Sequence, residues 1–373
     1  MTDKIPTCAL EDPPVLMCGN EAIGEAAIRA GCRAYFGYPI TPQNELTEYM
    51  SRRMVEERRI FLQTESELAA INMVFGASAI GFRAMTSSSG PGISLKQEGI
   101  SYLAGAELPA VIVNMMRGGP GLGNIGPGQS DYFQATRGGG HGDYRTPGLA
   151  GGSVQEVADL TFLAFDLADL YRTPTLILGD GVLGQMMEPV RFGTRERRAL
   201  PPKDWVLDGA RGRPPRSIRS LLLEPGALER HNRRLQEKYR AIEEAEVRCE
   251  EFLVEDARAI LVAYGISARL SRAVVKKLRA QGMKIGLFRP ITLWPFPSRR
   301  LRELSARAEG FLTVEMSCGQ MLDDVRLAVE GRKPVRFYGR AGGEILTFAE
   351  SEAAAREAMK ETRGRSATSA RSP

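Results

Sequence analysis

The sequence predicts an α/β protein in which a doubly wound domain is followed by a smaller α/β domain. Short β-branched runs alternate with small-residue helices from residue 15 to about residue 190, and a similar alternation resumes near residue 256. An arginine- and proline-rich stretch separates the two regions. Alternation of this kind builds a parallel sheet with helices on its faces. At 373 residues the chain is long enough for two such domains.

The first region, residues 15–190, carries the clearest element signals. The apolar runs at 111–116 and 174–180 predict strands. Helices are predicted at 20–32, which closes on a glycine, at 41–54, which opens on Thr-Pro, and at 153–171, which has a strong apolar stripe.

Residues 191–255 read as a connection followed by a charged helix. The part from 191 to 220 holds eight arginines and four prolines and has little apolar periodicity. A charged helix is predicted from about Pro225 to Phe252. The second α/β domain is expected at 256–350, with strands at 257–265, 284–290 and 311–317 and helices between them. The polar tail at 363–373 is expected to be disordered.

Composition and charge narrow the class of protein. Hydrophobic residues make up 43% of the chain and charged residues 25%, and no apolar run approaches the ~18 residues of a membrane helix. The N-terminal residues lack the basic and apolar pattern of a secretion signal, so we expect a cytoplasmic protein without a membrane partner. The net charge of +5 is concentrated in the arginine-rich stretch, which argues against a patterned nucleic-acid surface.

The cysteines and histidines do not form a metal-binding pattern. Five cysteines and two histidines are scattered without a C-x-x-C pair: Cys8, Cys18, Cys32, Cys249, Cys318, His141 and His231. Zinc and iron–sulfur sites need closely spaced ligands of these types. Any metal used by this protein is therefore expected to come from another chain.

The stretch TESELAAINMVFGAS (64–78) places a carboxylate at the start of an apolar helix. Thr64-x-x-Glu67 fits a capping box, in which the glutamate bonds an unpaired N–H at the helix start. However, Glu67 shares one helical stripe with four apolar residues, Ala70, Ile71, Val74 and Ala77, while Glu65 points the other way. Glu67 is thus either a capping residue or a functional carboxyl on the buried face.

Three further stretches are candidates for ligand binding. In FGYPITPQNE (36–45), Thr41 is expected at a helix N-cap, which either binds an anion or simply caps a βα turn. The hydroxyls and glycines of TSSSGPG (86–92) allow a ligand close to the backbone. Arg117 ends a strand and precedes a glycine-rich loop, 118–142, which is either a flexible excursion or a lid over a carboxylate clamp.

The Gly-Asp-Gly at 179–181 is interpreted as a strand-end turn. In thiamine diphosphate enzymes, such a motif is followed some tens of residues later by an asparagine, and together they bind Mg²⁺ and the diphosphate. Here the corresponding window is the arginine-rich stretch, which lacks a suitable asparagine.

Several motifs together resemble one enzyme family. They are GNEAIGEAAIRAGC, YPITPQNE, TESELAAINMVFGAS, TSSSGPGISLKQEGISYLAGAELP, MMRGGPGLG and GGGHGDYR, followed more weakly by LFRPITLWPFP and VEMSCGQM. The chain resembles the pyrimidine-binding, alpha-type subunit of 2-oxoacid:ferredoxin oxidoreductases, most closely the 2-oxoisovalerate (3-methyl-2-oxobutanoate) type. The resemblance implies a thiamine diphosphate pyrimidine-binding domain at 15–190 and a transketolase C-terminal-like domain at 256–350.

The resemblance also implies roles for single residues. Glu67 would hydrogen-bond a ring nitrogen of the aminopyrimidine and favour its imino tautomer. Thr41 and Arg117 would bind the 2-oxoacid, with the guanidinium on its carboxylate. The residues expected around the cofactor are Pro39, Ile40, Glu67, Ser88, Ser89 and Gly90.

In this family the active site lies between subunits, which implies several partners. A diphosphate-binding, beta-type subunit would hold the diphosphate, Mg²⁺ and a [4Fe–4S] cluster, and gamma-type and ferredoxin-like subunits would complete the complex. The reaction implied is oxidative decarboxylation of a 2-oxoacid to acyl-CoA, with coenzyme A as acceptor and reduction of ferredoxin. A 2-oxoglutarate enzyme, in which Arg137 or Arg145 binds the second carboxylate, a non-redox decarboxylase and a catalytically silent scaffold are the alternatives.

Overall fold

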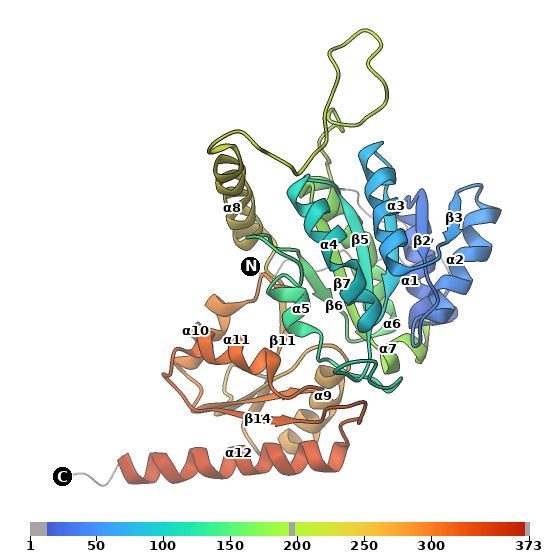
Figure 1. Cartoon of the computed structure of the whole chain (residues 1–373). Helices are drawn as coiled ribbons and strands as arrows, with labels where there is room; N and C mark the ends of the chain where they lie inside the picture. The colour runs from blue at the N-terminus through green and yellow to red at the C-terminus, as the bar shows by residue number, and fades with distance from the viewer. Residues whose placement is uncertain (1–12, 194–197, 370–373) are drawn as a thin grey trace.

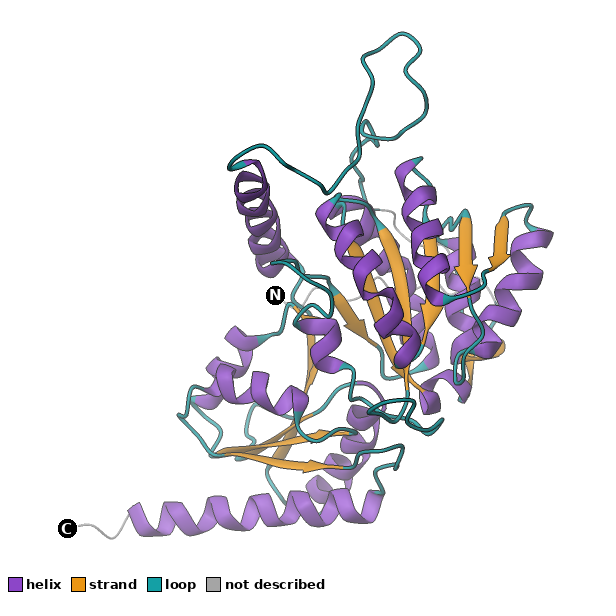
Figure 2. Cartoon of the chain, in the orientation of Figure 1, coloured by secondary structure: helices purple, strands orange, loops and turns teal. Residues whose placement is uncertain are grey.

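Two sheet-centred domains make up the structure, a computed structural model that describes residues 13–193 and 198–369, with side chains as far as residue 360. The larger domain forms one end of the molecule, and helix α12 lies along the outer side of the smaller domain at the other end (Figure 1). Figure 2 shows that helices flank the sheet in each domain. The predicted α/β class is therefore confirmed.

The first domain contains the following elements in chain order: β1 (Val15–Cys18), α1 (Gly19–Arg29), β2 (Ala34–Gly37), α2 (Asn44–Glu56), β3 (Ile60–Gln63), α3 (Glu67–Ala79), β4 (Ala84–Ser88), α4 (Pro91–Gly105), β5 (Ala110–Met116), α5 (Tyr132–Thr136), β6 (Gly148–Ala150), α6 (Val154–Tyr171), β7 (Pro174–Asp180), α7 (Gly181–Gln185) and β8 (Met187–Val190). The strands predicted at 111–116 and 174–180 are β5 and β7, and both are buried along their whole length. A strand that is covered on both faces has a continuous apolar sequence, and this pattern allowed both strands to be predicted.

A seven-stranded sheet in the order β12-β6-β7-β5-β4-β2-β3 forms the centre of this domain. All neighbouring strands are parallel except β12, which pairs antiparallel with β6. Helices α1, α2 and α6 pack together, and α3 packs against α4, as expected for a doubly wound sheet with two helical layers. Helix α6 begins after Ser153, whose hydroxyl accepts a hydrogen bond from the Glu156 N–H.

The second domain contains the elements α8 (Ala227–Ala245), β9 (Cys249–Phe252), β10 (Ala259–Val262), α9 (Gly265–Ala280), β11 (Ile285–Pro290), β12 (Thr292–Trp294), α10 (Ser298–Ser305), β13 (Gly310–Glu315), α11 (Gln320–Val329), β14 (Val335–Gly339) and α12 (Phe348–Ser369). Its sheet has the order β14-β13-β10-β11-β9. Strand β9 is the antiparallel edge, and the other pairs are parallel.

The charged helix predicted as far as Phe252 ends earlier, at Ala245. Residues 249–252 instead form β9. The acidic side chains of β9 pair with arginines of the second domain: Glu250 binds Arg289 at 2.7 Å, and Glu251 binds Arg300. These tertiary ion pairs, together with pairing to β11, favour an extended backbone where charge composition alone suggested a helix.

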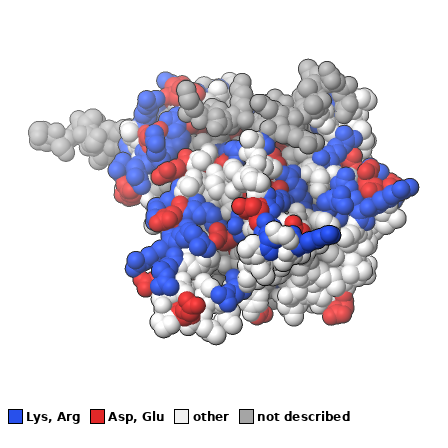
Figure 3. Space-filling model, turned by 90° about the horizontal axis from the view of Figure 1, so that it is seen from above, with Lys and Arg blue, Asp and Glu red and all other residues white. Residues whose placement is uncertain are grey.

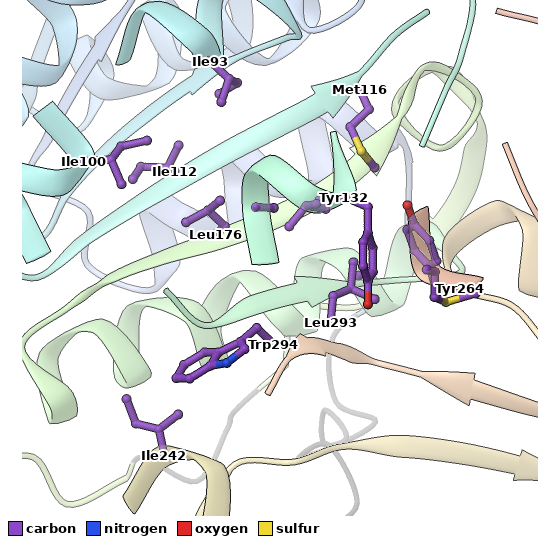
Figure 4. Close-up of a cluster of buried hydrophobic side chains, with 14 of the residues drawn as sticks. Ile93, Ile100, Ile112, Met116, Tyr132, Leu176, Ile242, Tyr264, Leu293 and Trp294 are labelled. Carbon is purple, nitrogen blue, oxygen red and sulfur yellow. The ribbon is translucent and has the colours of Figure 1, made fainter. Parts of the chain in front are cut away.

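Strand β12 joins the second half of the chain to the sheet of the first domain. It is only three residues long, so it gave no recognisable strand pattern. Trp294 of β12 packs edge-on against Tyr239 of α8, with ring centroids 5.8 Å apart. Tyr132 and Tyr264, also 5.8 Å apart, lie side by side where the domains meet (Figure 4). The hydrophobic core is thus continuous across the domain boundary.

Helix α12 extends into the tail expected to be disordered, 363–373. Its backbone is helical as far as Ser369, and residues 370–373 lie outside the described residues. Ala355, Ala358 and Met359 anchor the helix in the core of the second domain. Once such an anchor exists, each added residue of a helix costs little, so the helix can continue into a polar sequence.

Gln129 connects the glycine-rich loop of the first domain to two strand ends of the second. Its side chain is fully buried and donates to the Tyr264 carbonyl at 3.1 Å, while its Oε1 accepts from the Ser267 hydroxyl at 2.7 Å and the Met316 N–H at 2.9 Å. Its backbone N–H donates to the Met316 carbonyl and its carbonyl accepts from the Tyr264 hydroxyl. These five bonds position the loop relative to β10 and β13.

We predict that Gln129→Ala lowers the free energy of unfolding by about 2–4 kcal/mol, because it leaves buried donors and acceptors without partners. Urea denaturation followed by circular dichroism measures the change. Gln185→Ala, at an exposed position, is the control and should stay within about 0.5 kcal/mol of the native chain. Equal stability of both variants would show that Gln129 does not hold the domains together.

Candidate active site

The candidate site lies at the carboxyl edge of the seven-stranded sheet. Strands β2, β3, β4 and β5 are parallel and end at this edge, so the segments that follow them meet there. β2 pairs with β4 only at Ala34 and Tyr35, and the two strands are not paired beyond that point. Because α2 and α4 leave these strands toward opposite faces, this is a switch point of the sheet, where α/β proteins bind ligands.

Glu67 is the first residue of α3, and its side chain is only 6% exposed. The N-cap is Ser66, whose hydroxyl accepts from the Ala69 N–H at 3.2 Å. The capping box predicted from Thr64 is therefore wrong, and the Thr64 hydroxyl donates to the Ser66 carbonyl instead. Glu65 is exposed. The predicted buried stripe of α3 is confirmed, and it includes Glu67.

The Glu67 carboxyl lies against the backbone of α4. A Cβ atom on Gly92 would lie 2.5 Å from Glu67 Oε1 and 2.1 Å from Ser88 Oγ. The carboxyl and the Ser88 hydroxyl therefore occupy space that any other residue at position 92 would fill. Sequence reasoning did not single out Gly92, although its place in TSSSGPG could have indicated a close backbone approach.

Buried polar groups without protein partners surround this point. The hydroxyls of Ser88 and Ser89 and the Nε of Arg117 have no hydrogen-bond partner among the described residues. Buried groups of this kind are rare in folded proteins, and at a site they indicate places for a ligand. Ser88, Ser89 and Gly90 connect β4 to α4, so the cofactor-binding residues expected here lie in one short segment beside Glu67.

Arg117 and Thr41 are in direct contact. Arg117 is 7% exposed; its Nη1 donates to the Thr41 carbonyl at 3.0 Å and its Nη2 to the Leu122 carbonyl at 3.0 Å. A Cβ on Gly90 would lie 3.6 Å from Arg117 Cγ. The Arg117 guanidinium is thereby fixed beside the segment that also approaches Glu67.

Thr41 is not the N-cap that the sequence predicted. The Gln43 N–H bonds the Ile40 carbonyl and closes a turn, so Gln43 becomes the N-cap and α2 starts at Asn44. Of the two other residues expected at the cofactor, Ile40 is half-buried in this turn and Pro39 is exposed.

Asp131 is a site residue that sequence reasoning missed. Its carboxylate accepts from the Asn114 side chain at 2.9 Å and from the Gly90 N–H. Burial raises the pKa of Asp131, and the hydrogen bonds from Asn114 and Gly90 and the charge of Arg117 oppose this shift. The sequence feature that could have indicated a polar site here is Asn114, a polar residue within the apolar strand β5.

The glycine-rich loop 118–142 contacts the second domain and helix α4. At one end, the Asn124 side chain donates to the Gly342 carbonyl of the second domain. At the other, a Cβ on Gly139 would lie 2.6 Å from Gln97 Cδ of α4. Leu122, near the start of the loop beside Arg117, is 80% exposed. The loop is therefore anchored at Asn124, at the buried Gln129 and at Gly139, and it exposes an apolar side chain beside Arg117.

The Gly-Asp-Gly at 179–181 forms the strand-end turn that we predicted. Asp180 ends β7, and its carboxylate caps α7 by accepting from the N–H groups of Val182 and Leu183. It also accepts from the Ile266 N–H at the start of α9. Burial raises the pKa of Asp180 to about 6. Asp180 therefore joins two helix ends across the domain boundary.

The described residues contain no group of three or more His, Cys, Asp or Glu side chains that could hold a metal ion. Within the same ranges, no helix combines the length and the apolar character needed to cross a bilayer.

Lys96, one turn after Gly92, is a buried cation next to Glu67. Its side chain is fully buried, and its Nζ donates only a long bond, 3.4 Å, to the Glu67 backbone carbonyl. Burial lowers the pKa of Lys96 to about 8, and the negative charge of Glu67 limits the fall. The site thus contains an ammonium group with one long hydrogen bond, and burial disfavours its charged form.

Comparisons with known proteins place the chain in a family. Residues 25–251 match the family "Pyruvate flavodoxin/ferredoxin oxidoreductase, thiamine diP-bdg", and residues 257–351 match "Pyruvate:ferredoxin oxidoreductase core domain II". The chain therefore belongs to the thiamine diphosphate-binding 2-oxoacid:ferredoxin oxidoreductases, as an alpha-type subunit. The resemblance noted from the sequence motifs is confirmed.

Among individual relatives, the ketoisovalerate oxidoreductase subunit VorB of Methanothermobacter marburgensis is 56% identical over 88% of this chain and 93% of its own length. The 2-oxoglutarate synthase subunit KorA of Methanothermobacter thermautotrophicus is 38% identical over 88% of this chain and 94% of its own.

Two solved structures are similar to this chain. The 2-oxoglutarate:ferredoxin oxidoreductase from Magnetococcus marinus, solved with 2-oxoglutarate, coenzyme A and succinyl-CoA bound, matches with a TM-score of 0.84 and 26% identity over 93% of this chain and 66% of that chain. A split-gene transketolase shares the fold, with a TM-score of 0.57 at 16% identity.

We predict that Lys96→Met raises the free energy of unfolding at pH 7 by roughly 1–3 kcal/mol, because it removes a buried ammonium group. Since the pKa of Lys96 in the folded chain, about 8, lies below its ordinary value of 10.5, the unfolded chain binds more protons between these pH values. The stability of the native chain therefore rises with pH across this window.

The advantage of Lys96→Met should accordingly shrink from pH 8 to pH 10.5, as measured by urea denaturation at several pH values. Lys276→Met, at an exposed position, is the control and should show neither effect. A variant that is less stable than the native chain at every pH would contradict the assignment.

Proposed function

We propose that this chain provides the pyrimidine-binding and 2-oxoacid-binding half of a branched-chain 2-oxoacid:ferredoxin oxidoreductase. The observation that carries the proposal is the buried Glu67 carboxyl at a sheet switch point, held against Gly92 beside the unpartnered hydroxyl of Ser88. A carboxyl in this position is poised to share a proton with a weakly basic ring nitrogen.

The residues at the edge fit the aminopyrimidine ring of thiamine diphosphate. Glu67 would hold the ring nitrogen, and Ser88, Ser89 and Gly90 would line one side of it, with Pro39 and Ile40 in the adjacent turn. The unpartnered hydroxyls supply donors and acceptors for an aminopyrimidine. When bound, thiamine diphosphate supplies the electron sink that decarboxylation of a 2-oxoacid requires. Glu67 would exchange a proton with the ring nitrogen, shielded from bulk water.

Arg117 would bind the carboxylate of the 2-oxoacid. Its Nη atoms are held by the Thr41 and Leu122 carbonyls, so the guanidinium is fixed before substrate arrives. Its Nε has no described partner and is free to donate. A preorganised guanidinium binds a carboxylate without loss of further side-chain entropy. The Thr41 hydroxyl, at the same point, would position the keto group.

The outer face of α3 and α4 suits a diphosphate-binding, beta-type partner. Helix α3 is apolar around most of its circumference, and Leu68 and Met73 of α3 and Leu95 of α4 are exposed beside the site. A helix that is apolar on its exposed side as well is expected to be covered by protein. This partner would hold the diphosphate, Mg²⁺ and a [4Fe–4S] cluster, because Asp180 is occupied in capping helices.

Further subunits and co-substrates follow from the reaction. Gamma-type and ferredoxin-like subunits would complete the complex, ferredoxin would take the electrons, and coenzyme A would take the acyl group. The Magnetococcus marinus relative was solved with 2-oxoglutarate and coenzyme A bound, which supports a 2-oxoacid and coenzyme A as ligands for the present chain's complex.

We propose 3-methyl-2-oxobutanoate as the substrate. The 56% identity with ketoisovalerate oxidoreductase subunit VorB supports a branched-chain substrate over the 2-oxoglutarate suggested by the more distant KorA. The arginines considered for a second carboxylate have other contacts: Arg137 pairs with Asp324 at 3.1 Å, and Arg145 donates to the Arg137 carbonyl. The apolar Leu122 beside Arg117 suits an aliphatic side chain.

Replacing Glu67 with Gln should reduce turnover by at least 100-fold, because the amide cannot exchange the proton. The assay is viologen reduction with coenzyme A and 3-methyl-2-oxobutanoate in the complex with co-purified subunits. Glu65→Gln, two residues earlier and exposed, is the matched control and should retain activity. Near-native turnover by Glu67→Gln would leave Glu67 with a purely structural role and would favour the scaffold alternative.

For Arg117→Ala we expect a rise in KM for 3-methyl-2-oxobutanoate of about 10- to 100-fold, equivalent to loss of a charge-assisted hydrogen bond of about 1.5–3 kcal/mol. Steady-state kinetics of the same complex measures it. Arg137→Ala should leave this KM unchanged. If Arg137→Ala raises KM instead, and 2-oxoglutarate is the better substrate, the branched-chain assignment is wrong.

A further inference from the structure

A cavity of about 740 Å³ lies between the C-terminal end of α4, the N-terminal turn of α8 and residues 204–222 of the connecting segment. We call it the linker cavity. Its lining includes five arginines and two acids: Arg172, Arg216, Arg219, Arg230, Arg234, Glu107 and Asp204. Figure 3 looks down on this end of the molecule and shows clusters of basic side chains with acidic ones interspersed.

Only two of the five arginines form a salt bridge with a described residue. Arg234 pairs with Glu107 at 2.7 Å, and Arg216 lies 3.6 Å from Asp208. Arg219 and Arg230, in contrast, have no acidic partner among the residues that the structure describes. Unpaired guanidinium groups that line one concave site favour a ligand with concentrated negative charge.

The Trp205 ring lines the same cavity as these arginines and forms one of its walls. Arg172 stacks on the Trp205 ring, with its guanidinium carbon 4.7 Å from the ring centroid, and its Nε donates to the Glu107 carbonyl. Burial lowers the pKa of Arg172, which an anion nearby would offset. Ile218 and Leu222 add apolar surface to the same cavity. Its lining therefore suits a ligand with both an anionic part and a flat organic part.

A histidine bridge fixes one side of the linker cavity. His231 Nε2 lies 2.7 Å from the Gly105 carbonyl, and its Nδ1 lies 2.8 Å from Arg234 Nη2. A carbonyl only accepts and a guanidinium only donates, so the proton sits on Nε2 and Nδ1 accepts from Arg234. The bridge ties α8 to the end of α4 and orients the Arg234 side chain.

The linker cavity lies at the opposite end of the sheet from the candidate active site. Glu107 precedes β5 and Arg172 precedes β7, so both lie at the amino ends of strands whose carboxyl ends face the site. The seven residues of β5 separate the two ends by roughly 20 Å. A ligand in the linker cavity therefore does not reach the reacting groups.

We propose that the linker cavity binds a nucleotide-like polyanion, a small molecule that carries two or more phosphoryl groups on an aromatic base. The phosphoryl groups contact Arg219 and Arg230, and the base lies along the wall formed by Trp205 and Ile218. The cavity volume falls within the range of small-molecule sites. The proposal is independent of the function assigned to Glu67 and Arg117.

Tryptophan fluorescence of the purified full chain tests the proposal. The chain has two tryptophans, and only Trp205 lines the linker cavity, whereas Trp294 is buried in the core. We expect ATP and ADP to cause saturable quenching that Trp205→Phe abolishes. Pyrophosphate should compete with ATP, and citrate at matched ionic strength should not.

The double variant Arg219→Ala/Arg230→Ala should raise the Kd for ATP at least tenfold. Arg299→Ala is the matched control, because its side chain is 94% exposed on α10, and it should bind ATP as the native chain does. Circular dichroism checks folding, and Arg230→Gln replaces the double variant if that variant unfolds. Absence of saturable quenching, equal binding by the arginine variants, or equally strong competition by citrate would each overturn the proposal.

Discussion

The buried amide of Gln129 is the interaction on which the arrangement of the whole chain depends. It bonds Tyr264 and Met316, which follow the ends of β10 and β13, to the glycine-rich loop 118–142. A buried amide whose nitrogen donates to one domain partner and whose oxygen accepts from two others opposes sliding of one domain over the other. The loop that follows Arg117 is therefore held by contacts made in the second domain, far along the sequence.

The carboxyl edge of the sheet contains several buried polar groups that have no described partner. Ser88 and Ser89 are buried without described partners, and Lys96 is a buried cation with one long bond. Elsewhere, buried charges are paired, as Asp169 of α6 is with Arg83 and Lys203. Groups left unpaired at one edge lower stability there, and this is the pattern expected where a ligand completes the hydrogen bonding.

The two ends of the sheet have different chemistry because different parts of the chain cover them. The carboxyl edge faces the second domain and the glycine-rich loop, and the buried Glu67 carboxyl lies there in close contact with Gly92. The amino edge is covered by the connecting segment and α8, which bring arginines such as Arg219 and Arg230. The same α/β scaffold thus presents a buried carboxyl at one end and a basic cavity at the other.

The sequence by itself determined the α/β class, β5 and β7, and the burial of Glu67, because these depend on local periodicity and continuous apolar runs. The tertiary structure alone decided that residues 249–252 form a strand, that Gln43 rather than Thr41 caps α2, and that Gly92 adjoins the Glu67 carboxyl. Each of these depends on partners distant in sequence. Ion pairs, turn hydrogen bonds and close backbone contacts form only once the chain is folded, so no local pattern encodes them.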